Sequence, residues 1–336
     1  MFYYLTFEVQ TSRVINVPKG STSSIITYLD KKNYDINIID KYILISLGHP
    51  QSGWIDLKST NMTKADFLHK LTTSKAALKK VTLIPGETYY FFLQELADTL
   101  NISTIKLFDT YARYAYKKDG NIIADTYHLP LGMDETQLIK HLFLLTENRY
   151  KTLSNTIFGE YNKKNWYKYL TIASIIQKES ASKDEMSTIS SVIYNRVKKD
   201  MKLQMDGTLN YSKYSHTKVT PTMIKEDKSE YNTYKNKGIP KNPICAVELA
   251  SIKAAIFPIK SDYLYFVKSS DAKSHLFSNN YKDHKRNIRK LKIYNKKKKK
   301  RVKTRIKKSN TKKNKKPKII KQDKKVTTKN LKDLWN

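Results

Sequence analysis

The stretch LTIASIIQKES, from Leu170 to Ser180, carries the pattern that decides the second half of the fold. It contains neither Gly nor Pro and predicts a single helix. Glu179 follows Ile175 and Ile176 by four and three positions, so its carboxyl lies on the apolar stripe of that helix. A carboxylate is costly to remove from water unless it is paired or titrates, which makes Glu179 a candidate functional acid. The alternative is that the stripe ends one turn earlier and Glu179 is solvated.

Charge is distributed very unevenly along the 336 residues. Of the formal net charge of +34, about +19 falls between Lys292 and Asn336, where 21 Lys or Arg face two acids. This composition predicts a disordered basic tail over 293–336. A polycation attracts nucleic acid, anionic lipid or acidic wall polymers. No aromatic residue interleaves the Lys runs, so base stacking is not indicated, and a merely solubilising tail is the alternative.

The single cysteine and the apolar runs limit the class of protein. Cys245, between Ile244 and Ala246, predicts a buried small residue, and one cysteine excludes an intramolecular disulfide. No apolar run reaches the roughly 18 residues that a membrane helix requires. The start, Met1 to Phe7, is too short for a signal-peptide core and is compatible with the end of a membrane helix that begins upstream.

Short strands and helices alternate in the first half of the chain. The pattern predicts strands at 14–17 and 80–84, a helix over 64–71 opened by Thr63 with Asp66 as a capping box, and a helix capped by Thr88 through Leu100. Two cycles of strand, turn and helix are compatible with a carbohydrate-binding module of the LysM type. We therefore expect an α+β N-terminal region over 1–160 that includes a LysM-like subdomain.

Longer helices follow, and they predict a mixed, helix-rich domain over 161–292. The expected elements are helices at 166–180, 183–199 and 247–257, strands at 263–267 and 275–277, and a closing helix at 280–294. The boundary falls near 150–163, where the sequence is polar and aperiodic.

Carboxylate chemistry remains after other classes of site are excluded. The chain has no Gly-rich phosphate loop, no GxSxG elbow and no HExxH, so we expect neither a cofactor nor a metal. Asp184 and Glu185 lie at a helix start, where a structural role is favoured. Asp206, in LQMDGT, is the other acid in an interesting polar context. Glycoside hydrolysis normally needs two carboxylates, so one buried carboxyl without an evident partner suits a reaction without activated water.

Several ordered segments carry a wider resemblance. They are ASIIQKES (173–180), VIYNRV (192–197), LQMDGT (203–208), YNTY (231–234), GIPKNPI (238–244), ASIKAA (250–255), YLYFV (263–267) and His275-Leu276-Phe277, with VTLIP (81–85) and ADTYHLP (124–130) upstream. In order and spacing they resemble the YceG-like family of endolytic murein transglycosylases, over about residues 14–292. Three local departures are Gln177 for an acid, Gly207 for Pro, and Leu276 for Thr. The family's N-terminal membrane helix is also not seen in this chain.

The resemblance implies a lyase that cuts inside nascent peptidoglycan strands at the MurNAc–GlcNAc β-1,4 bond and leaves 1,6-anhydroMurNAc ends. Glu179 is then the catalytic acid and base, at the periplasmic or extracytoplasmic face of the cytoplasmic membrane, beside peptidoglycan synthases. The residues expected along the glycan cleft are Asn195, Gln204, Asp206, Thr208, Tyr231, Asn232, Thr233 and Tyr234. Each of these also has a structural reading, and His275 is as readily a hydrogen-bonded structural residue as a cleft residue.

Three alternatives remain open at this stage. The protein could be a non-catalytic peptidoglycan-binding scaffold, or a nucleic-acid or polyanion binder that acts through its tail. A conventional lysozyme-like hydrolase would differ only in giving a reducing sugar at the new end.

Overall fold

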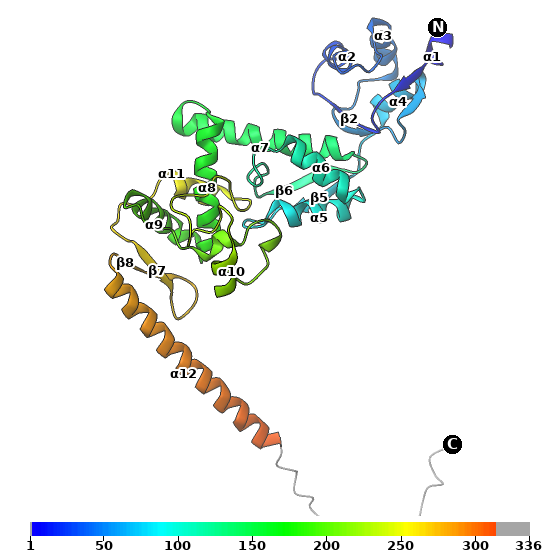
Figure 1. The fold of residues 1–336 in the computed structure, drawn as a ribbon. Helices are drawn as coiled ribbons and strands as arrows, with labels where there is room; N and C mark the ends of the chain where they lie inside the picture. The colour runs from blue at the N-terminus through cyan, green and yellow to red at the C-terminus, as the bar shows by residue number, and fades with distance from the viewer. Residues whose placement is uncertain (1, 314–336) are drawn as a thin grey trace, which may run out of the picture.

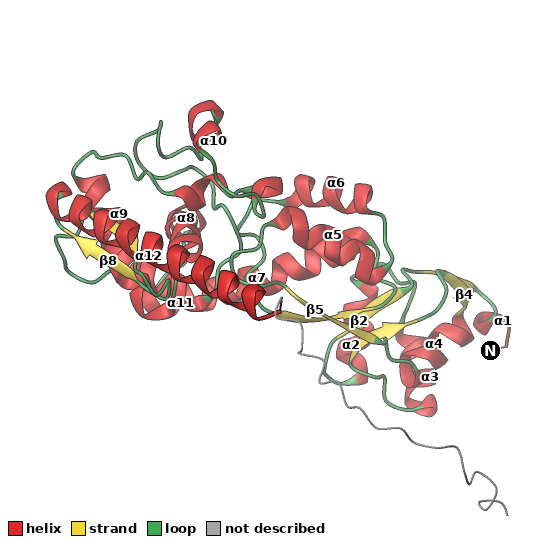
Figure 2. Cartoon of the chain, turned by 90° about the horizontal axis from the view of Figure 1, so that it is seen from below, coloured by secondary structure: helices red, strands yellow, loops and turns green. Residues whose placement is uncertain are grey.

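The structure is a computed structural model that describes residues 2–313. Three modules, each with its own cluster of buried hydrophobic side chains, follow one another along the chain, and a long helix projects from the third (Figure 1). The strands form four antiparallel pairs within the described residues, and Figure 2 shows them as short ribbons among the helices. The expected α+β class is confirmed.

The first module combines four helices with two strand pairs. Its elements are α1 (Phe2–Leu5), β1 (Glu8–Gln10), β2 (Val14–Val17), α2 (Thr22–Asp30), α3 (Ile38–Leu47), β3 (Gly53–Asp56), β4 (Asn61–Thr63) and α4 (Lys64–Thr73). Strand β1 pairs with β4, and β2 pairs with β3. Thr63 caps α4 as predicted, because its side chain accepts a hydrogen bond from the Asp66 N–H. The expected capping box is only half formed, since the Asp66 carboxylate accepts the Thr63 hydroxyl at 2.8 Å and not the Thr63 backbone N–H.

The second module has the order strand, helix, helix, strand. It contains β5 (Leu78–Thr82), α5 (Tyr89–Leu100), α6 (Thr104–Tyr114) and β6 (Thr126–Pro130), followed by the long helix α7 (Glu135–Phe158). Strands β5 and β6 pair antiparallel, with Lys80 opposite His128. Helix α7 packs on α6, and its Gln137 side chain donates to the Val14 carbonyl at 2.8 Å, which ties the second module to the first.

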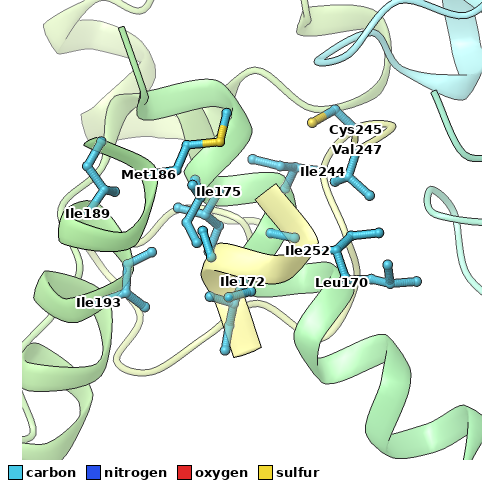
Figure 3. Close-up of a cluster of buried hydrophobic side chains, with 14 of the residues drawn as sticks. Leu170, Ile172, Ile175, Met186, Ile189, Ile193, Ile244, Cys245, Val247 and Ile252 are labelled. Atoms are coloured by element: carbon cyan, nitrogen blue, oxygen red, sulfur yellow. The ribbon is translucent and has the colours of Figure 1, made fainter. Parts of the chain in front are cut away.

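Helix α8 is the centre of the third module. This module contains α8 (Lys163–Glu179), η1 (Lys183–Glu185), α9 (Met186–Lys198), η2 (Asp206–Leu209), η3 (Ser212–Tyr214), α10 (Pro221–Glu226), α11 (Leu249–Ile256), β7 (Tyr265–Lys268) and β8 (His275–Ser278). Every residue of α8 from Leu170 to Ile176 is buried, since α9 and α11 pack around it (Figure 3). Cys245 is fully buried in the same cluster, as predicted.

Backbone and side-chain hydrogen bonds join the second module to the third. The Gly86 N–H donates to the Ala246 carbonyl at 2.9 Å, and the Ala246 N–H donates to the Glu87 carbonyl at 2.7 Å. Helix α5 begins after Thr88 as expected, but the Thr88 hydroxyl does not cap it. That hydroxyl donates to the Ser212 carbonyl at 3.0 Å instead. The cap position therefore connects the two modules.

The closing helix is much longer than expected. Helix α12 runs over Tyr281–Lys313, whereas the sequence suggested a helix ending near Tyr294 and a disordered tail from 293. Lys and Arg are good helix formers, and neither Gly nor Pro interrupts the chain between 281 and 313. The rest of the expected tail, 314–336, lies outside the described residues. Within the described part of the chain, no helix is long and apolar enough to span a bilayer.

Candidate active site

Glu179 is the last residue of α8, and its carboxyl is held at the end of the buried helix. The side chain is partly buried, and its Oε1 accepts a hydrogen bond from the Gly207 N–H at 2.7 Å. Burial raises the pKa of the Glu179 carboxyl from 4.5 to about 7, and the negative charge of Asp206 adds to that rise. The Gly207 N–H acts in the opposite direction, because it stabilises the carboxylate. The carboxyl is therefore poised to exchange a proton near neutral pH.

A cavity of about 420 Å³ opens in front of Glu179. One side is formed by α8 and the segment from Leu203 to Asp206, and the other by β7, His275 and the start of α12. The lining residues are Glu179, Arg196, Leu203, Gln204, Met205, Asp206, Tyr234, Tyr265, Phe266, Val267, Lys268, His275, Tyr281, His284 and Ile288. An elongated polar ligand therefore has groups of both charges available to it.

Gly207 approaches Glu179 so closely that a side chain would not fit. A Cβ at this position would lie 2.7 Å from Lys178 Cβ and 2.8 Å from Glu179 Oε1. Gly207 thus has two effects on Glu179. Its backbone N–H donates a hydrogen bond to the carboxyl, and its lack of a side chain leaves space for that carboxyl.

Two buried threonines hold this loop against the 231–234 segment. The Met205 N–H donates to Thr233 Oγ1 at 3.1 Å, and the hydroxyls of Thr208 and Thr233 lie 3.0 Å apart. The Gln204 N–H donates to the Thr233 carbonyl at 3.1 Å, with Gln204 in the left-handed region at φ 50°. Both threonines lie beneath the cavity and fix the loop rather than line the cavity.

Asp206 and Tyr234 form a pair at the cavity wall. The Tyr234 hydroxyl donates to Asp206 Oδ1 at 2.6 Å, and both residues line the cavity. Burial, followed by this carboxylate, raises the pKa of the Tyr234 hydroxyl, so the tyrosine stays protonated. Asp206 therefore has one oxygen engaged by Tyr234 and a second, Oδ2, that can accept from a ligand in the cavity.

Three further predicted residues lie outside the cavity and support its walls. Asn195 in α9 donates to the carbonyls of Ser261 at 2.7 Å and Tyr263 at 3.0 Å. Tyr231 is buried and stacks on Tyr211 with 4.2 Å between ring centroids. Asn232 is fully buried and donates to two loop carbonyls. Of the predicted set, the structure brings Glu179, Gln204, Asp206 and Tyr234 together at the cavity.

His275 combines both of its expected readings. The ring Nδ1 of His275 lies 2.8 Å from Glu185 Oε1, and the backbone N–H of His275 donates to Glu185 Oε2 at 2.9 Å. The residue also lines the cavity. Glu185 is buried and thereby fastens β8 to the start of α9. The structural role favoured for Glu185 is therefore an anchor for His275.

The wall made by β7 and α12 was not predicted from the sequence. Tyr265, Lys268, Tyr281 and His284 line it, and Arg196 reaches it from α9. The available signal was the pair of aromatic residues Tyr265 and Phe266 followed by Lys268 in the expected strand. Within residues 2–313, no group of three His, Cys, Asp or Glu side chains is placed to hold a metal ion.

One partly buried carboxyl at a cavity lined by charged and aromatic side chains suits acid–base chemistry. Comparisons with known proteins show the family. Residues 15–290 match the sequence model of the YceG-like family, and the chain belongs to this family. It is 31% identical over 307 residues to the endolytic murein transglycosylase of Bacillus subtilis strain 168, covering 82% of this chain and 83% of that protein.

Two other similar proteins extend this comparison. The endolytic murein transglycosylase of Streptococcus pneumoniae strain D39 is 28% identical over 256 residues, and the match spans 73% of this chain but only 44% of that protein. The crystal structure of a YceG-like protein from Listeria monocytogenes aligns with a TM-score of 0.53 and 24% identity, over 82% of this chain and 99% of that one. The structural likeness confirms the fold.

Proposed function

We propose that this protein is an endolytic peptidoglycan lytic transglycosylase. It cleaves the MurNAc–GlcNAc β-1,4 bond within nascent glycan strands and leaves 1,6-anhydroMurNAc ends, which terminates strand elongation. The relatives named endolytic murein transglycosylases support the activity. The observation that carries the assignment to residues is Glu179, a carboxyl with a pKa of about 7 at a cavity of about 420 Å³.

In this mechanism Glu179 serves first as the acid and then as the base. The protonated carboxyl donates its proton to the glycosidic oxygen as the bond from that oxygen to C1 of MurNAc breaks. The resulting carboxylate takes the proton from the C6 hydroxyl of the same sugar, whose oxygen attacks C1. Because the nucleophile belongs to the substrate, no water is consumed and its effective concentration is high.

The hydrogen bond from Gly207 assigns different tasks to the two oxygens of Glu179. Oε1 accepts the Gly207 N–H, so Oε2 is the oxygen that carries the transferred proton. Asp206 is the second acidic residue that lines the cavity. Its Oδ1 already accepts the hydrogen bond from the Tyr234 hydroxyl. An electrostatic role for Asp206, which keeps the proton on Glu179, follows from its effect on the Glu179 pKa.

Digestion of purified glycan strands tests this function. We expect the wild-type protein to give internal fragments with anhydroMurNAc ends by mass spectrometry, and Glu179→Gln to give none. Asp184→Asn is the matched control, because Asp184 is an exposed acid outside the cavity. Hydrated reducing ends would instead identify a hydrolase and direct attention to Asp206. Bound but uncut strands would identify a scaffold.

The second module supports a LysM-like assignment. Its order β5, α5, α6, β6, with the two strands paired antiparallel, suits the carbohydrate-binding module expected within the 1–160 region. Because Thr88 and Gly86 bind this module to the third, the module lies next to the proposed catalytic domain, 161–292. We propose that it holds the glycan strand while Glu179 cuts it.

The proposed substrate implies a place of action. Nascent peptidoglycan lies outside the cytoplasmic membrane, so we propose action at the extracytoplasmic face, beside peptidoglycan synthases. The basic residues of α12 suit contact with anionic lipid or another polyanion. Co-sedimentation with anionic vesicles, weakening as salt rises, would test that contact. Nucleic-acid binding through the tail and a non-catalytic scaffold are not favoured by the similar proteins.

A further inference from the structure

Arg196 is a buried cation beside the cavity. Its side chain extends from α9, is 7% exposed, and lies under the Tyr265 ring with 5.1 Å from the guanidinium carbon to the ring centroid. Nε donates to the Leu264 carbonyl at 2.6 Å, and Nη1 donates to the carbonyls of Lys202 and Leu203 at 3.0 and 2.8 Å. These bonds fix the plane and direction of the guanidinium.

The positive charge of Arg196 has no negative partner in the described structure. No described carboxylate lies within 4.0 Å of it, and Nη2 makes no hydrogen bond to a described residue. Burial lowers the pKa of Arg196, and the charge of Arg196 in turn contributes to lowering the pKa of His284. A buried charge without a partner of opposite charge is costly. An anion bound next to Arg196 would therefore stabilise this site.

Lys268 adds a second cation to the same wall. It is exposed at the end of β7 and lines the same cavity as Arg196, Glu179 and Asp206. No described acid lies within 4.0 Å of the Lys268 amine either. The cavity therefore presents two cations in addition to the carboxyl groups of Glu179 and Asp206.

We infer that Arg196 and Lys268 form a binding subsite for an oxyanion group of the glycan strand. The inference rests on the proposed function, because it takes a peptidoglycan strand as the occupant of the cavity. The sugars of such a strand are uncharged once the lactyl group is linked to a peptide. The anions are then the carboxylates of the peptide stem or a terminal diphosphate. The Nη2 amine of Arg196 can donate to either group, and hydrogen bonds between a cation and an oxyanion are among the stronger ones.

The subsite would place the strand relative to Glu179. An anion fixed by Arg196 and Lys268 orients the attached sugar, so that the Glu179 carboxyl meets a defined glycosidic oxygen. The class of substrate is therefore a strand that carries acidic groups, rather than a bare polysaccharide.

Binding to the Glu179→Gln protein tests the subsite without turnover. The ligands are stem-bearing strands that retain a terminal diphosphate, the same strands with carboxylates converted to amides and the diphosphate removed, and amidated strands that retain the diphosphate. We expect amidation without diphosphate to weaken binding roughly tenfold, the loss of one charged hydrogen bond. Tight binding of amidated strands with diphosphate would identify phosphate as the source of the anion, and weak binding would identify the stem carboxylate.

Variants of Lys268 separate the subsite from a structural role. In the same background Lys268→Met is expected to bind native and amidated strands alike, and Lys268→Arg to restore the preference. Lys260→Met is the control, because Lys260 is exposed outside the cavity. Arg196→Gln is expected to lose the preference too, but Arg196 also braces the β7 wall, so Lys268 carries the test.

Two outcomes would overturn the inference. One is equal binding of native strands and of amidated strands without diphosphate. The other is a Lys268→Met variant that weakens both ligands by the same factor. Cleavage by the wild-type protein is measured separately. Equal cutting of native and amidated strands would keep the proposed function and reject the subsite. Preferential binding without any cutting would keep the subsite and reject the activity.

Discussion

Two carboxyls in this protein have nearly the same electrostatic state and very different surroundings. Burial raises the pKa of Glu179 and of Asp119 to about 7, and each accepts one backbone hydrogen bond, from Gly207 at 2.7 Å and from Tyr89 at 2.8 Å. Glu179 faces a cavity of about 420 Å³, whereas Asp119 is 3% exposed near the junction of the second and third modules. A raised pKa therefore records burial, and access to a cavity distinguishes the candidate catalytic group.

Adjacent residues of α8 serve these two regions. The Lys178 amine donates to the Ser215 hydroxyl at 2.8 Å. Its positive charge offsets part of the rise that burial causes in the Asp119 pKa. Glu179, the next residue, meets Gly207 at the cavity. The last turn of one buried helix thus connects the module junction on one side with the candidate active site on the other.

Removing each carboxyl is the strongest way to break the comparison. We expect Glu179→Gln to lower the rate of strand cleavage by roughly 10² to 10⁴, the range for general acid–base catalysis. Asp119→Asn keeps the acceptor for the Tyr89 N–H and is expected to stay within about twofold of wild type. Initial rates on defined strands measure both. Comparable losses in the two variants would refute the distinction.

The pH dependence of cleavage sharpens the comparison. Glu179 acts first as an acid, so its protonated form is the active one. The rate is expected to be flat below the pKa of about 7 and to fall roughly tenfold per unit above it. Asp119→Asn should show the same profile, since Asp119 does not contribute a proton. A profile that rises through pH 7, or one that moves in Asp119→Asn, would assign the titration to another group.

Gly207 offers a smaller and more specific effect. Gly207→Ala and Gly207→Pro both add a Cβ against Lys178 and Glu179, but only proline removes the N–H. Both are expected to be slower than wild type by roughly tenfold. Because the N–H stabilises the carboxylate, its loss raises the Glu179 pKa, so the alkaline fall should lie roughly 0.5–1 unit higher in the proline variant. Identical profiles would show that the hydrogen bond does not tune Glu179.

The smallest expected effect concerns stability at Asp119. Its folded pKa of about 7 exceeds the usual 3.8, so the folded state binds the proton more tightly than the unfolded chain. Its contribution to wild-type stability therefore falls as pH rises from about 4 to 7, and Asp119→Asn removes the part of the loss that comes from this carboxyl. Urea unfolding should find the variant roughly 1–3 kcal/mol more stable at pH 8 and unchanged at pH 4. Equal differences at both pH values would contradict the assignment.

Local patterns anticipated the elements that position Glu179 but not the whole cavity. The spacing of the isoleucines before Glu179 predicts a single helix. The structure has this helix as α8, which ends at Glu179. Thr208 and Thr233 were expected along the cleft, yet both are buried beneath it, because short polar side chains also suit loop bracing. Periodicity does not distinguish these two uses.

Contacts between distant segments could not be inferred in the same way. Arg196 binds the carbonyl of Leu264, 68 residues away, and the β7 wall exists only because of such contacts. Arg196 follows the apolar positions of α9 and looks like an ordinary last-turn cation. The length of α12 does not follow from composition, because a run of lysines is typical of disordered segments although lysine is also a good helix former.

Digestion of glycan strands in water enriched in a heavy oxygen isotope tests the central claim most directly. If Glu179 transfers the proton and the C6 hydroxyl attacks, the new anhydro ends carry no label, and Glu179→Gln forms no new ends. Labelled reducing ends in the wild-type digest would show that water is the nucleophile and would contradict the transglycosylase assignment.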